Sequence, residues 1–316
     1  MACAQRVPVR TYLQRDTHAP RVPPPQVLGK LEARRAHVAA LNTSAAWRQR
    51  QAEVRDGLGM FLAPLPPAGR ARQPRLIEAG TARRDGFHVR KLLVESRPGY
   101  WIPAGLWVPD FPPAVKRPAI LYAAGHEGEA WRWDGADDWE NGGGDQIVQI
   151  NLVKRGFVVL GFDPIGQGER QMDRDLDPAG GSLTNGSQSW SPTFEHEYLN
   201  RQLFLSGTTA AATVVWDMTV LMDVLENGVQ VPQADSSRLG VAGCSGGGTQ
   251  AAYFAAVDPR AMVASVACYM STFAVDYVRQ LQLRPYFRPF PTQFLKLYPH
   301  TPRTRSLPRP PPTRLR

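Results

Sequence analysis

The sequence predicts an α/β fold in which a mostly parallel sheet is covered by helices on both faces. Three observations support this prediction. Two short runs, Ala119–Ala123 and Phe157–Phe162, are fully apolar, as in strands that are buried on both faces. Segments with helical spacing alternate with such runs, as they do in βαβ units. A glycine-rich turn at residues 243–247 joins an apolar strand directly to a helix.

Composition and charge limit the function classes. The chain has 316 residues, of which 43% are hydrophobic and 21% charged, so it can form a soluble domain with a sizeable core. It contains no run of 18 apolar residues, and we therefore expect no membrane span. The net charge is +9, but residues 277–316 hold nine Lys/Arg and no acid, so the rest of the chain is neutral. We do not expect binding to nucleic acid.

The N-terminus and the cysteines bear on the compartment. Residues 1–26 are rich in proline and arginine and are expected to be irregular; they fit either an organelle transit peptide or a frayed terminus. There are three cysteines, Cys3, Cys244 and Cys268, and this small, odd number implies no disulfide framework. A reducing, cytoplasmic compartment is the default expectation. The sequence does not determine the oligomeric state.

A helical arm and then a hairpin are predicted for the first half of the chain. Residues 27–84 are assigned to the arm, because apolar side chains recur there at helical spacing before a run of prolines. His88–Ser96 and Tyr100–Val108 are rich in valine, leucine and aromatic residues. Arg97-Pro98-Gly99 lies between them and is typical of a hairpin turn.

Helices and strands then alternate. Ile147–Lys154 and Thr208–Glu226 are predicted as helices, the second because its apolar residues form a single stripe. The polar segment 171–206 between them is expected to be a long surface excursion. Further along, the sequence predicts a strand, a helix and a strand at Leu239–Gly243, Thr249–Val257 and Met262–Cys268.

The central motif is Gly243-Cys244-Ser245-Gly246-Gly247, which fits the G-x-S-x-G pattern of a nucleophile elbow. The pattern alone is weak, but it lies directly between a strand and a helix, as an elbow requires. Glycine at 243 and 247 allows close approach of the chain, and the helix N-terminus favours a developing oxyanion. The alternative is a turn that binds phosphate or nothing. We interpret Cys244 as a packed small side chain, not as the nucleophile.

Four segments in order carry a resemblance to a known family. They are Ser96-Arg97-Pro98-Gly99-Tyr100, Gly156-Phe157-Val158-Val159-Leu160, Asp163-Pro164-Ile165-Gly166-Gln167-Gly168-Glu169-Arg170 and Gly243-Cys244-Ser245-Gly246-Gly247-Gly248-Thr249. Together they resemble the acetyl-xylan-esterase and dipeptidyl-aminopeptidase-like branch of the α/β-hydrolase superfamily. The resemblance covers about residues 27–272, with residues 85–276 expected to form a C-terminally incomplete hydrolase core.

The resemblance implies roles for particular residues. Ser245 would be the nucleophile that forms an acyl-enzyme, and the Gly246 N–H would donate to the oxyanion. The second donor would be the backbone N–H of His126 or Glu127, whereas a catalytic role for the His126 side chain is not expected.

Other polar residues are expected to have structural roles. Asp163, Glu169 and Arg170 follow a strand and are expected to form an ion-pair and turn network that shapes the site. An acidic patch is interpreted as a solvated loop; it consists of Asp134, Asp137, Asp138 and Glu140. We expect no metal and no cofactor.

The triad partners of Ser245 are not evident. In this fold the acid and then the histidine follow the serine, but only Asp258, Asp276 and His300 do so here. Asp258 precedes the next predicted strand and is wrongly placed. Asp276 and His300 have the right order and are the remaining candidates for acid and base, although neither follows an apolar strand.

Residues 277–316 have nine prolines and no glycine, and three interpretations remain open. The segment is a product of a shifted frame or alternative splice that replaces further strands, or a basic, proline-rich interaction tail, or it carries an unorthodox base through His300.

Four functions follow. We expect a serine-dependent carboxylic ester hydrolase of acetyl-esterase type, acting on a small acyl ester or an acetylated carbohydrate and inactive if the triad is incomplete. The alternatives are a non-catalytic hydrolase remnant, a dipeptidyl-peptidase-like serine peptidase, and a binding protein that uses the tail.

Overall fold

The computed structural model describes residues 25–67, 73–112, 115–132, 144–171 and 192–270. It divides into two compact units. One consists of residues 55–270 and contains the sheet; the other consists of residues 1–54 and 271–316. In the latter, the described residues form helix α2 (Pro25–Ala39) and most of α3 (Ser44–Phe61), as the sequence predicted for the arm.

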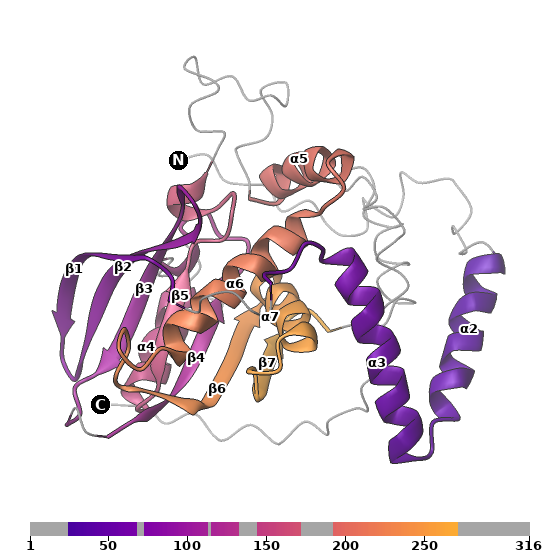
Figure 1. The fold of residues 1–316 in the computed structure, drawn as a ribbon, viewed down its shortest axis with the longest axis horizontal. Helices are drawn as coiled ribbons and strands as arrows, with labels where there is room; N and C mark the ends of the chain where they lie inside the picture. Colours follow the sequence, from indigo (N-terminus) through magenta and orange to yellow (C-terminus); the bar gives the residue numbers. More distant parts are fainter. Residues whose placement is uncertain (1–24, 68–72, 113–114, 133–143, 172–191, 271–316) are drawn as a thin grey trace, which may run out of the picture. The chain divides into compact units, whose positions relative to one another are not determined.

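A seven-stranded sheet organises the unit 55–270, with the strand order β1-β2-β3-β5-β4-β6-β7 (Figure 1). The pairs β5–β4, β4–β6 and β6–β7 are parallel, whereas β1–β2, β2–β3 and β3–β5 are antiparallel. The strands are β1 Leu76–Arg84, β2 Phe87–Arg97, β3 Tyr100–Pro109, β4 Arg117–Ala123, β5 Val158–Phe162, β6 Ala234–Cys244 and β7 Val263–Ala267.

The antiparallel part contains the predicted hairpin and one unexpected strand. β2 and β3 are joined by a tight turn in which Gly99 has a φ of 76°, a backbone conformation that glycine adopts without strain. Strand β1 lies inside the range that we assigned to the helical arm, so the sheet begins before residue 85. β1 is mostly exposed, which explains why its sequence lacks an apolar run.

Helices cover both faces of the parallel strands, and the predicted fold class is confirmed. Helix α4 (Asp145–Lys154) packs on β3 and β5, whereas α6 (Ala210–Glu226) and α7 (Gly246–Val257) pack on β4 and β6 (Figure 1). Every residue of β5 is buried, as expected for a strand that is covered on both sides.

Helix α5 and the end of α3 also pack within the unit 55–270. Part of the predicted surface excursion forms helix α5 (Pro192–Leu205), which packs on α6. The remainder of that excursion lies outside the described residues. The last turn of α3 belongs to the unit 55–270 and packs within it: the rings of Phe61 and Tyr253 lie 6.1 Å apart, and Leu62, the next residue, is fully buried.

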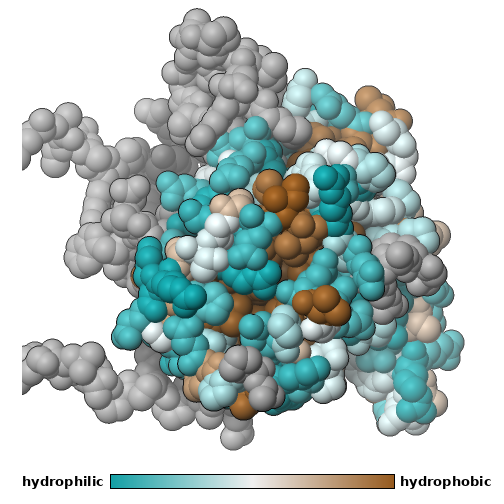
Figure 2. Space-filling model, turned by 60° about the vertical axis from the view of Figure 1, so that its left-hand side comes forward, coloured by the Kyte–Doolittle hydropathy of each residue, from teal (hydrophilic) through white to brown (hydrophobic). Residues whose placement is uncertain are grey.

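The surface is of mixed character. On the face in Figure 2, hydrophobic side chains form a few small groups separated by hydrophilic ones. Within the described residues, no single helix has the length and hydropathy of a membrane span; only the sharply bent pair Glu195–Leu205 and Ala210–Glu226 passes that test jointly.

Candidate active site

Strand register brings the carboxyl ends of four strands to one edge of the sheet. Ala123 at the end of β4 pairs with Phe162 of β5 and with Gly243 of β6, and Cys244 pairs with Ala267 of β7. The segments that follow these strands therefore start side by side. They contain His126, the Asp163–Arg170 motif and Ser245. Ligands of open α/β sheets bind at this edge.

Ser245 occupies the apex of a sharp strand-to-helix turn. It has φ 55° and ψ −117°, a strained conformation for a residue with a side chain, and α7 begins at the next residue. The turn is held by two hydrogen bonds: the Ser245 N–H donates to Ala267 O at 3.0 Å, and the Thr249 N–H donates to Ser245 O at 3.0 Å. The geometry is that of the predicted elbow.

Glycine is required on either side of the apex because backbone atoms approach closely there. A Cβ atom at Gly243 would overlap the carbonyl group of Gly247, and one at Gly247 would overlap the carbonyl oxygens of Ala123 and Ala124. Since backbone cannot move aside as a side chain can, the two glycines are a steric condition for the turn. They also bring α7 close against the end of β4.

A disulfide bond joins Cys244, the neighbour of Ser245, to Cys268 at the end of β7, with their Cα atoms 5.2 Å apart. The cysteine count did not lead us to expect this bond, and our interpretation of Cys244 as a packed small side chain is wrong. The reason is the parallel register: Cys244 lies opposite Ala267, which places Cys268 directly beside it. The bond fastens the elbow to β7.

The loop after β4, which carries Gly125, His126 and Glu127, is held from two sides. Asp145 at the start of α4 accepts hydrogen bonds from the Tyr122 hydroxyl at 2.6 Å and from the Gly125 N–H at 3.0 Å. On the other side, Gln167 Nε2 donates to Gly125 O at 2.7 Å and to Glu127 O at 2.8 Å. A loop fixed in this way presents its backbone to the elbow with little freedom.

These anchoring residues were not singled out from the sequence. Gln167 belongs to the Asp163–Arg170 segment that carried the resemblance, which was the available signal. For Asp145 the sequence offered no signal except that an acid stands at the start of a helix. Burial raises the pKa of Asp145, although both of its hydrogen bonds favour the charged form.

His126 lies against the elbow and beside a second histidine, His196 of α5. The two ring centroids are 5.2 Å apart. Burial, together with the neighbouring His196, lowers the pKa of His126 to about 4, so the ring is neutral near pH 7. His196 is half-buried, and its Nε2 lies 2.6 Å from the carbonyl oxygen of Ile165. Because a carbonyl can only accept, Nε2 of His196 carries the hydrogen.

Asp163, Glu169 and Arg170, which follow β5, take part in ion pairs. Arg132 Nη2 lies 2.8 Å from Asp163 Oδ2 and Nη1 lies 3.6 Å from Glu169 Oε1. The Glu169 N–H also donates to Asp163 at 3.0 Å. Burial nevertheless raises the pKa of Asp163 to about 6, although Arg132 opposes the shift. Arg170 links this group to α6: its Nη1 donates to Asp163 O at 2.9 Å, and its Nη2 lies 2.9 Å from Oδ2 of the buried Asp217.

The proposed triad partners are not located by the structure. Asp276, His300 and the acidic patch at residues 134–140 lie outside the described residues. Asp258 is described, and its carboxylate binds Arg260 at 2.6 Å, so it fastens the end of α7 and does not face Ser245. Among the described residues, no group of three or more His, Cys, Asp or Glu could hold a metal ion.

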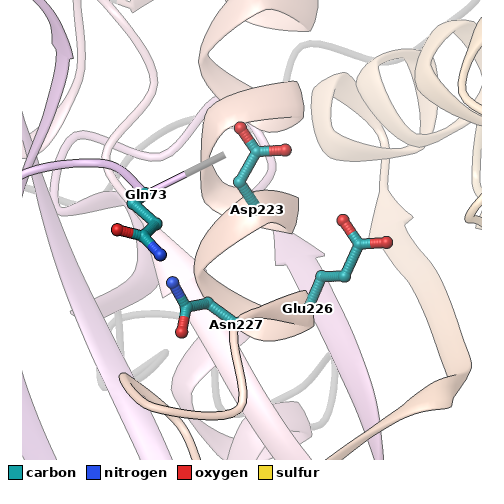
Figure 3. Close-up of a pocket in the computed structure, with 4 residues that line it drawn as sticks. All are labelled: Gln73, Asp223, Glu226 and Asn227. Carbon is teal, nitrogen blue, oxygen red and sulfur yellow. The ribbon is translucent and has the colours of Figure 1, made fainter. Parts of the chain in front are cut away.

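A hollow of about 400 Å³ lies away from this edge, at the C-terminal end of α6 (Figure 3). Its lining includes Asp223 and Glu226, whose carboxylates lie 2.6 and 2.9 Å from Arg260 Nη1. These acids thus take part in the structural network that joins α6 to α7. The hollow is distinct from the elbow.

Comparison with known proteins supports the fold. No protein-family model matches the sequence, and no curated protein matches it. A protein of Bacteroides fragilis NCTC 9343, to which acetyl xylan esterase activity is ascribed, superposes with a TM-score of 0.53 at 17% identity. The match covers 70% of this chain and 53% of that one, so this chain spans about half the length of that protein.

Two further structures give lower TM-scores. Acetyl xylan esterase 1 from Thermoanaerobacterium sp. JW/SL YS485 has a TM-score of 0.40 and 19% identity over 74% of this chain and 67% of that one. A glucuronoyl esterase from Solibacter usitatus has a TM-score of 0.43 and 14% identity over 71% and 59%. The strand order, the elbow after β6 and the likeness to the Bacteroides structure show that the described part of this chain has the α/β-hydrolase fold.

Proposed function

We propose that this protein is a carboxylic ester hydrolase in which Ser245 is the nucleophile. The main support for this proposal is the backbone of Ser245, which is held in a strained conformation at the carboxyl edge of the sheet and at the start of α7. Strain of this kind persists only where the surrounding structure enforces it, and it is typical of functional sites. The esterase names of the structural neighbours agree with the proposal.

The reaction would proceed in two halves. Ser245 Oγ attacks the ester carbonyl carbon while a base takes the hydroxyl proton, and the carbonyl oxygen becomes an oxyanion. The N–H of Gly246 and the N–H of His126 or Glu127 would donate hydrogen bonds to this oxyanion. The oxyanion collapses, the alkoxide leaves with the proton, and water then releases the acid from the acyl-enzyme by the same steps.

We propose His300 as the base and Asp276 as its partner, because they have the chain order that this fold uses. The substrate class that we propose is a small acyl ester such as an acetylated carbohydrate. This choice follows the acetyl xylan esterase names among the neighbours.

Hydrolysis of p-nitrophenyl acetate by the purified chain tests the proposal. Ser245→Ala should abolish turnover, and Ser206→Ala, which alters an exposed serine after α5, should leave it unchanged. Where a complete triad operates, loss of the serine costs roughly 10⁶ in kcat. Turnover that survives in Ser245→Ala would refute the role of Ser245, and turnover that survives in His300→Ala would refute the proposed base.

A second candidate is a non-catalytic hydrolase remnant that binds a ligand without turnover. One observation favours it: the sole acid described after Ser245 is Asp258, which is bound to Arg260. Background turnover of the parent, of Ser245→Ala and of His300→Ala alike would favour this candidate over the esterase. Binding of acetylated xylo-oligosaccharides without turnover, followed by calorimetry, would then support it directly.

A further inference from the structure

The imidazole of His126 presents its polar edge to the elbow. If a Cβ atom is placed on Gly246, its nearest neighbours are three atoms of that ring: Cε1 and Nδ1 at 2.5 Å and Nε2 at 2.8 Å. These atoms form the edge that contains both nitrogens. The ring nitrogens therefore lie beside the first residue of α7, where the backbone N–H groups at the helix N-terminus point into the site.

The surroundings hold this ring in place and in the neutral form. His196 lies beside it, with the planes of the two rings inclined by 60°, and His196 is itself tied to the carbonyl of Ile165. On the main-chain side, Asp145 and Gln167 hold Gly125, the residue before His126. A neutral imidazole has one N–H donor and one lone pair. It can donate a hydrogen bond without the desolvation cost of a buried cation.

We propose that the side chain of His126 donates its ring N–H to the carbonyl oxygen of the ester bound at Ser245, beside the N–H of Gly246. This inference rests on the proposed esterase function and adds a side-chain donor to an oxyanion site that was expected to use backbone N–H groups. A preorganised donor is worth most where negative charge develops in a site from which water is excluded. Neutral histidines polarise substrate carbonyl groups in this way in other enzymes.

The position of the ring also explains why residue 246 is glycine. Gly246 is the first residue of a helix, a position that tolerates many side chains, yet a Cβ atom there would overlap the His126 ring. Unlike Gly243 and Gly247, whose neighbours are backbone atoms, Gly246 is constrained by a side chain. Removing that side chain should relieve the constraint, and this gives a test that does not depend on turnover.

The catalytic test compares His126→Ala with His126→Asn, which retains an N–H donor close to the Nδ1 position. His126→Ala should lower kcat for p-nitrophenyl acetate by about 10²–10³ with a smaller change in KM, as loss of one oxyanion donor does. His126→Asn should recover at least about tenfold of that loss. The matched control is His88→Ala, which alters a histidine of β2 that pairs with Asp110.

The outcomes separate this inference from the proposed function. If turnover does not depend on Ser245 at all, both fail. If it depends on Ser245 but His126→Ala stays within about threefold of the parent, only the inference fails. If His126→Asn is as impaired as His126→Ala, the ring has a packing role alone and the proposal is overturned.

The second test measures unfolding in urea for a double-mutant cycle. Gly246→Ala should destabilise the parent, because the new methyl group meets the ring. The same substitution should cost clearly less in the His126→Ala background. Equal costs in the two backgrounds would show that the ring does not lie against Gly246, and the proposed hydrogen bond would then be excluded on geometric grounds.

Discussion

Replacing both Cys244 and Cys268 by alanine should lower the free energy of unfolding by about 3 kcal/mol. The two residues are 24 positions apart, and closing a loop of that length in the unfolded chain removes conformational entropy worth about 3 kcal/mol. Reducing the parent with dithiothreitol should have the same effect, because it opens the same loop. The single variant Cys3→Ala is the control and should change nothing.

Urea unfolding followed by tryptophan fluorescence measures the effect, and a thiol titration in denaturant checks its cause. Without reductant the unfolded parent should show one free thiol, that of Cys3, and after reduction it should show three. A midpoint that reductant leaves unchanged, or three free thiols before reduction, would refute the assignment of the bond.

Two further predictions concern buried charge. Arg260→Met removes the cation that Asp223 and Asp258 face, and it should destabilise the chain by about 3–5 kcal/mol in the same urea assay. The control Arg238→Met alters a more exposed ion pair and should cost less than about 1 kcal/mol. Equal costs for the two variants would contradict the role given to Arg260. His126 has a pKa of about 4, below its ordinary 6.5, so between these values the unfolded chain binds a proton that the folded chain does not. The free energy of unfolding should therefore fall as the pH is lowered from 6.5 to 4, by up to about 3 kcal/mol more in the parent than in His126→Gln. If the free energies of unfolding of the two proteins depend on pH in the same way, the low pKa of His126 is refuted.

The sequence predicted the parallel half of the sheet well because burial on both faces leaves a plain signal. Ala119–Ala123 lies within β4, the run that ends at Phe162 forms β5, and Met262–Cys268 contains β7. The helix predicted at Thr208–Glu226 is α6, whose apolar stripe is buried. In each case the hydrophobic period reports which side chains leave water, and that is a local property of the sequence.

Elements whose formation depends on a partner were missed. Strand β1 is mostly exposed and exists through its pairing with β2, so its residues show no apolar run. Helix α5 lies in a segment that we expected to be a surface excursion, yet Glu195 on it is buried and His196 is half-buried. Polar residues of this kind give no hydrophobic period, and only the packed neighbours make them interior.

The elbow could be identified from its motif, because glycine, serine and glycine at fixed spacing express a steric requirement of the turn itself. Its surroundings could not. Three contacts around it join segments at least 20 residues apart. They are the disulfide between Cys244 and Cys268, the hydrogen bonds of Asp145 and Gln167 to Gly125, and the contact of the His126 ring with Gly246. The sequence by itself determined which segments become strands and where the chain turns at Ser245. The tertiary structure alone decided which polar groups meet there, because strand order and register set these long-range contacts and no local pattern encodes them.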